Sequence, residues 1–71
     1  MYIPRVETKE DDVFWEGRPC RTIHGAKCAA LHELRKHPEA ATPTPVLFAA
    51  VFDDNGKRVA THVSDGWMMF D

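Results

Sequence analysis

Seven consecutive apolar residues, from Val46 to Phe52, constrain the fold of this chain more than any other feature of its sequence. The run is far shorter than the roughly 18 residues that a membrane-spanning helix needs, so we expect no membrane span. Asp53-Asp54-Asn55-Gly56 follows it, and Asn-Gly readily adopts the positive φ of a hairpin turn. The run therefore predicts a β-strand that enters a hairpin and has both of its faces buried.

The residues on either side of this hairpin predict a three-stranded meander. Residues Lys57 to Val63 alternate in polarity, Ser64-Asp65-Gly66 predicts a turn, and Trp67 to Phe70 predicts a short last strand. The proline-rich stretch Glu39 to Pro45 predicts a stiff loop before the meander. In the middle strand we expect one face to carry Val59, Thr61 and Val63 and the other to carry Arg58, Ala60 and His62.

The N-terminal third predicts short strands. Tyr2 to Thr8 alternates loosely, and Pro4 within it predicts an edge strand, because proline cannot donate to a β-ladder. Val13-Phe14-Trp15 and Cys20 to Ile23 also read as strands, separated by a polar stretch that contains Gly17 and Pro19. Two alternatives stay open for this segment, a hairpin or one bent strand.

A helix is predicted from Gly25 to His37, because Ala26, Ala29, Ala30, Leu31 and Leu34 recur at helical spacing. Pro38 disfavours helix at the preceding residue and ends the run. Small alanine side chains on the apolar face predict close packing of this helix on a sheet.

Together these elements predict a single α+β domain over residues 1–71. We expect a four- or five-stranded antiparallel sheet with one α-helix packed on one face, in the order β-β-α-β-β-β. One short helix covers one face only, yet the run Val46 to Phe52 is apolar on both. The N-terminal strands, a second copy of the chain or a foreign partner could cover the second face.

The net charge argues against general packaging of nucleic acids and against polybasic binding to membranes, but it hides an uneven distribution. The chain carries a net charge of −2, but residues 17–38 sum to +4 and the flanking segments to −3 each. The basic residues of this central segment are Arg18, Arg21, Lys27, Arg35 and Lys36. They predict either a solvated helix face or a surface that complements an acidic partner.

Catalytic and metal-binding signals are weak. Cys20, His24, Cys28 and His32 recur at intervals of four, but on one helix their ends would lie about 18 Å apart, too far to surround a single ion. A Cys–His pair lacks a third orienting residue, and no glycine-rich phosphate loop occurs. We therefore expect no enzyme activity, no metal and no cofactor. Two cysteines without an export signal favour free thiols in the reducing cytoplasm.

Binding of a macromolecule is the function that the remaining features favour. Aromatic residues, methionine and arginine are enriched at protein interfaces, and the candidates here are Trp15, Trp67, Met68 and Phe70, with the basic residues as a rim. In the competing interpretation both tryptophans fill the small core. We expect a protein partner or a homodimer; the alternative is a nucleic-acid-binding module that uses residues 17–38.

Four segments carry a resemblance to a known group of proteins: Thr22 to Leu31, Val46 to Phe52, Asp53 to Ala60 and Gly66-Trp67. A short strand that leads into an alanine-rich helix, a D-x-N-G hairpin and a strand with Gly-Trp resemble small proteins encoded by phages and prophages. That group includes anti-CRISPR proteins, which block an effector by binding it. The resemblance implies an accessory protein, of the kind that can inhibit a host system, and assigns no functional residue.

Overall fold

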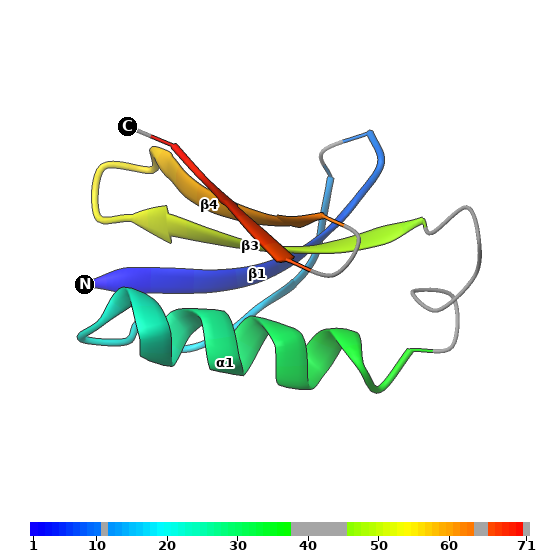
Figure 1. Cartoon of the computed structure of the whole chain (residues 1–71), viewed down its shortest axis with the longest axis horizontal. Helices are drawn as coiled ribbons and strands as arrows, with labels where there is room; N and C mark the ends of the chain where they lie inside the picture. Colours follow the sequence, from blue (N-terminus) through cyan, green and yellow to red (C-terminus); the bar gives the residue numbers. More distant parts are fainter. Residues whose placement is uncertain (11, 38–45, 64–65, 71) are drawn as a thin grey trace.

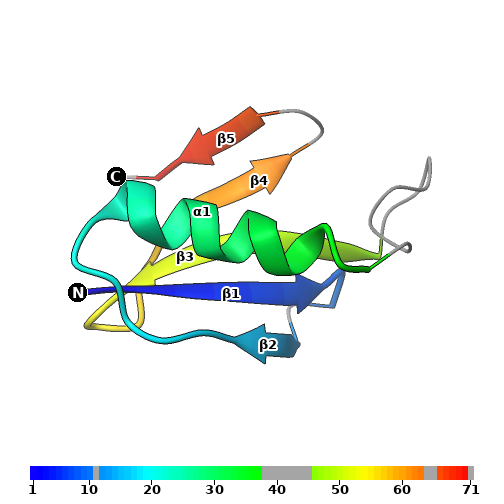
Figure 2. The same cartoon turned by 90° about the horizontal axis from the view of Figure 1, so that it is seen from below.

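The computed structural model describes residues 1–10, 12–37, 46–63 and 66–70. Within them, five strands form one antiparallel sheet in the order β2-β1-β3-β4-β5, and helix α1 packs on one face (Figures 1 and 2). The elements are β1 (Tyr2–Thr8), β2 (Val13–Glu16), α1 (Ile23–Leu34), β3 (Leu47–Asp53), β4 (Arg58–Val63) and β5 (Gly66–Met69). The predicted α+β fold and its element order are confirmed.

The predicted loop Glu39 to Pro45 and residues 64–65 of the predicted second turn lie outside the described residues. Among the described residues, no helix has the length and apolar character to cross a membrane.

The helix begins two residues earlier than predicted, and the predicted strand Cys20 to Ile23 is wrong. Thr22 caps the helix, because its backbone is extended and its Oγ1 accepts a hydrogen bond from the Gly25 N–H at 3.0 Å. Cys20 forms one isolated β-bridge, with Tyr2. The segment before the helix is therefore neither a second strand of a hairpin nor the end of one bent strand.

Pro4 does not lie in an edge strand, because β1 runs between β2 and β3. Gly17 donates to the Pro4 carbonyl, so the Pro4 nitrogen also points toward the β2 side. At that point β2 has ended at Glu16, and the next bridge to β1 joins Tyr2 and Cys20. The missing N–H of Pro4 thus falls just beyond the end of the β2 ladder, where it removes one bond at most.

A β-bulge overturns the expected faces of β4. The register passes from Val51 opposite Ala60 to Phe52 opposite Arg58, so Val59 is the extra residue. Beyond the bulge, Arg58 lies on the same face as Thr61, to which its guanidinium donates a hydrogen bond. Arg58 is therefore on the face opposite to Ala60, and Val59 packs toward the helix-side core.

The hairpin between β3 and β4 is confirmed. The Asp53 carboxylate accepts hydrogen bonds from the N–H groups of Asn55 and Lys57, each at 2.9 Å. Gly56 has a φ of 78°, the left-handed conformation in which glycine has no steric cost, and its N–H donates to the Asp53 carbonyl. These contacts form a three-residue loop of the common bulged type.

The main core lies between α1 and the sheet. Small buried alanines let the helix approach closely, as the sequence predicts. One cluster contains Val6, Ala30, Leu34, Leu47 and Ala49, and a second contains Ala26, Val51 and Ala60. Trp67 packs against both clusters and Trp15 against the first.

The second face of β3 is covered by side chains of the neighbouring strands. Phe52 is only 7% exposed, although no described helix lies over it, because the guanidinium carbons of Arg5 and Arg58 lie 4.3 and 4.8 Å from its ring centroid. Glu7, on the same face, is 4% exposed and bonds Arg58 at 2.8 Å. The N-terminal strands lie beside β3 in the sheet rather than over it. Burial of this strand therefore needs neither a second copy nor a foreign partner.

Candidate functional site

Strand β5 is an outer strand whose free side exposes backbone hydrogen-bonding groups. It pairs with β4 in the register Thr61 to Met68, and the Phe70 N–H extends this ladder by donating to the Val59 carbonyl. Alternate residues of a strand point their N–H and C=O to opposite sides. The backbone groups of Trp67 and Met69 therefore point away from β4, toward the side where no described strand lies (Figure 2).

Exposed apolar side chains accompany this free edge on both faces of the sheet. Met68 and Met69 are 47% and 51% exposed, and Phe70 is 40% exposed. The register puts Met68 on the face opposite to α1, together with exposed Val63, and Met69 on the face of α1. Residues Gly66 to Phe70 contain no charge and no proline. We call these five residues the β5 edge.

The opposite edge of the sheet, β2, is better protected against strand pairing. A register shift lies between Val6 and Glu7, where β2 pairs. Glu16 at the end of β2 carries a charge and bonds the Arg5 side chain at 2.7 Å. Bulges and charges are the devices that prevent edge strands from pairing with other chains, and the β5 edge has neither. The two edges thus differ in their capacity to accept a strand.

Trp67 is the anchored residue of the β5 edge. Its ring is half-buried against the core, in edge-to-face contact with His62 at 5.3 Å between centroids. The Lys27 ammonium nitrogen lies 5.4 Å from the centroid of the same ring. Of the predicted contact residues, the structure brings Lys27, Trp67 and Met68 to one edge. Met68 is exposed, whereas the Trp67 ring both packs on the core and borders the surface.

Trp15 lies at the other end of the sheet, on β2. It is half-buried against the first core cluster, and a Cβ atom at Gly17 would lie only 2.5 Å from its Cη2 atom. Three strands lie between β2 and β5 in the sheet. The two tryptophans therefore do not form one surface, and both contribute to the core as the competing interpretation expects.

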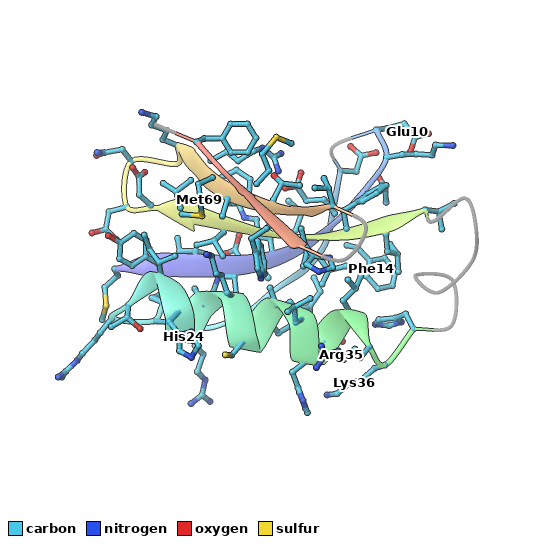
Figure 3. The ribbon with its side chains drawn as sticks, viewed as in Figure 1. Glu10, Phe14, His24, Arg35, Lys36 and Met69 are labelled. Carbon is cyan, nitrogen blue, oxygen red and sulfur yellow. The ribbon has the colours of Figure 1, made fainter. Side chains whose placement is uncertain are left out.

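The predicted basic residues are also divided between two places. Arg18 and Arg21 precede the helix. Arg35 and Lys36 follow its last residue, Leu34 (Figure 3). A helix of 12 residues is about 18 Å long, so the two pairs are separated by that length. All four side chains are exposed, and Lys36 lies 3.4 Å from the Glu33 carboxylate.

The end of α1 carries a small ionic and aromatic cluster. His37 Nε2 lies 3.2 Å from Glu33 Oε2, and its ring meets Phe14 of β2 edge-to-face at 4.9 Å. The hydrogen bond from His37 and the nearby Lys36 charge lower the pKa of Glu33 below its ordinary value of 4.5. The cluster joins the end of the helix to β2, and Figure 3 shows Phe14 near the end of α1 that carries Arg35 and Lys36.

The cysteines and histidines with four-residue spacing do not converge on one point. Cys28 Sγ lies 3.6 Å from His24 Nε2 on the exposed side of α1, whereas Cys20 contacts the Arg18 carbonyl before the helix. Within the described residues, no group of three or more potential ligands is close enough to hold a metal ion. Both cysteines are free thiols.

Sequence reasoning missed Val63 and Met69 as parts of the exposed edge. The sequence predicts Met69 in the last strand, but nothing in it shows that this strand lies at the rim of the sheet. The alternation of residues in β4 assigns Val63 to one face, but its exposure follows from the lack of a described helix over that face. The signal available in advance was the lack of charge from Gly66 to Phe70.

A scan against models of known protein families, a search of curated proteins and a search of solved structures each returned no match for this chain.

Proposed function

We propose that this chain is a non-catalytic protein-binding module, and that the β5 edge is its contact surface. The observation that carries the proposal is an outer strand with free backbone groups, exposed apolar side chains on both faces and no charge. Such an edge accepts an extended segment of another chain as an additional strand. The backbone bonds then supply affinity, and the side chains on alternate faces supply specificity.

The surroundings of the β5 edge support protein binding. Methionine side chains adapt to irregular surfaces, and Met68 and Met69 flank the free edge on its two faces. Trp67 is held by the core, Lys27 and His62, so little conformational entropy is lost when a partner contacts it. We place this function in the reducing cytoplasm, where Cys20 and Cys28 stay free thiols.

Affinity capture from a cell lysate tests the proposal. The immobilised protein is compared with Met68→Arg, which adds a charge to the β5 edge, and with Val13→Arg, the matched change on the edge strand β2. Loss of a central apolar contact typically lowers affinity by about tenfold or more. We expect Met68→Arg to lose the captured protein and Val13→Arg to keep it.

Equal capture by all three proteins contradicts the assignment of the contact to the β5 edge. Circular dichroism and thermal unfolding serve as the folding control, because both substituted side chains are about half exposed and we expect the fold to tolerate the change. The resemblance to phage-encoded accessory proteins is compatible with this mode of action, but the exposed strand supports it independently.

A further inference from the structure

We infer that the strand which the β5 edge accepts is the β5 edge of a second copy of this chain, in antiparallel pairing centred on Met68. This inference rests on the proposed function and names its partner. Three features carry it: the direction of the free backbone groups, the sizes of the side chains along the edge, and the closure of this pairing as a dimer.

The backbone groups fit a two-fold arrangement about Met68. In that register Trp67 faces Met69 of the second copy, and Met69 faces Trp67 of the second copy. These are the two residues whose N–H and C=O point away from β4. Each such pair can exchange both of its backbone hydrogen bonds. Met68 then lies opposite Met68 of the second copy at the two-fold axis. The two residues form a non-hydrogen-bonded pair, with their Cα atoms about 4.5 Å apart.

The side chains along the edge are complementary in size in the same register. Gly66 lies opposite Phe70 of the second copy, and beyond its chain neighbours no described atom lies within 4 Å of the place where a Gly66 Cβ would be. Val63, 39% exposed, lies beside Gly66 on β4. A phenylalanine ring over a cross-strand glycine fills such a space and shields the backbone. The exposed Phe70 ring of each copy would therefore be covered by Gly66 and Val63 of the other.

The helix-side face of the edge is complementary as well. The register places Trp67 next to Met69 of the second copy, and a thioether beside an aromatic ring is a favourable contact. Since opposite residues of a pair lie on the same face, both helices would cover the same side of one continuous sheet. The half-exposed Met69 side chain would then be covered from the direction of the free edge.

Closure favours this pairing over pairing through the other edge. The segment from Gly66 to Phe70 itself carries no charge, and Asp65 and Asp71, which flank it in the sequence, face each other at the two ends of this register. Pairing of β5 with β2 of another molecule would leave free edges at both ends and generate a fibre. Pairing of β5 with itself closes as a dimer.

A disulfide cross-linking experiment tests both the partner and the register. In a background with Cys20→Ser and Cys28→Ser, Met68→Cys is compared with Met69→Cys, which is similarly exposed in the single chain. Oxidised glutathione accepts the two electrons and the two protons released as each disulfide forms. Met68→Cys should cross-link at least about tenfold faster, because its Cα atoms would meet at the axis. The two Cα atoms of Met69→Cys would be more than about 7 Å apart, beyond disulfide reach.

Sedimentation of the unmodified protein from about 1 µM to about 1 mM accompanies this test, because short interfaces dissociate in that range. We expect the mass to double with concentration, and Met68→Arg but not Val13→Arg to stay monomeric. A monomer throughout, or equal cross-linking by the two cysteine variants, overturns the inference. A monomer that still captures a lysate protein in a Met68-dependent manner overturns only self-pairing. A monomer that captures nothing overturns the proposed function as well.

Discussion

At the scale of single residues, the buried carboxylate of Glu7 is the feature of the molecule that most needs a compensating charge. One of its oxygens bonds the Arg58 guanidinium at 2.8 Å, and the other, Oε1, is buried without a hydrogen-bond partner among the described residues. A charge in this position depends on its counter-ion, because removal of one member of a buried pair leaves the other uncompensated. Arg58 also covers Phe52, so it contributes both charge and packing.

We therefore expect Arg58→Met to lower the free energy of unfolding by about 3 kcal/mol, the lower end of the range for a broken buried pair, since Arg58 is partly exposed. The double variant Glu7→Leu with Arg58→Met should recover to within about 1 kcal/mol of the wild type, because no unpaired charge then remains. Urea unfolding of the single and double variants measures both values. A double variant as unstable as Arg58→Met alone would show that lost packing on Phe52, rather than the charge of Glu7, dominates.

At the scale of the elements, the helix start shows the effect of one capping side chain. Without the contact from Thr22, the sequence from Cys20 to Ile23 reads as a strand, since it contains residues of high β-propensity. The hydrogen bond from the Gly25 N–H to Thr22 Oγ1 satisfies one of the unpaired donors of the first turn. The cap therefore fixes the residue at which the strand-like segment becomes a helix.

Thr22→Ala should lower the free energy of unfolding by about 1 kcal/mol, the usual cost of losing an N-cap. Thr22→Asn is the matched control, because asparagine caps a helix at least as well as threonine and should keep stability within about 0.5 kcal/mol. Thermal unfolding monitored by circular dichroism compares the three proteins. Equal stability of the alanine and threonine forms would show that packing of Ala26 and Ala30 fixes the helix start without the cap.

The elements also show how far local pattern determines the fold. Turn chemistry predicted the hairpin at Gly56, and apolar spacing predicted the helix and the central strand, since each of these signals is contained within a few residues. The position of Pro4 and the faces of Arg58 and Val59 depend instead on where a neighbouring strand ends or bulges. Such non-local pairing leaves no periodic signal in the sequence, so those predictions were wrong.

At the scale of the whole molecule, the same reasoning explains which parts of the candidate site could be predicted. Composition identified Trp67 and Met68, because aromatic and methionine residues stand out in a chain this small. It could not show that the β5 edge is outermost, which follows from the order of all five described strands. It also grouped basic residues by their closeness in sequence, whereas the helix holds Arg21 and Lys36 at opposite ends.

This separation of charge leads to a last prediction, on nucleic acid. Strong binding to phosphates needs several cations along one path, and affinity then falls steeply with salt. Here the exposed cations of residues 17–38 lie at the two ends of α1, and exposed Lys9 and Lys57 lie in separate turns of the sheet. Arg5 and Arg58 lie on the other face of the sheet, paired with Glu16 and Glu7. We expect negligible binding to a labelled single-stranded or double-stranded oligonucleotide at about 0.15 M salt, where the screening length is about 8 Å.

Fluorescence anisotropy measures this binding, with the double variant Arg35→Glu and Lys36→Glu as the matched test. The variant should leave protein capture through the β5 edge unchanged, because both residues lie beyond the C-terminal end of α1, whereas Lys27, near the start of the helix, is the cation at Trp67. Tight binding that weakens steeply with salt, and that the double variant abolishes, would instead support the nucleic-acid-binding alternative. In that case residues 17–38 would form the functional surface, and the exposed β5 edge would need another explanation.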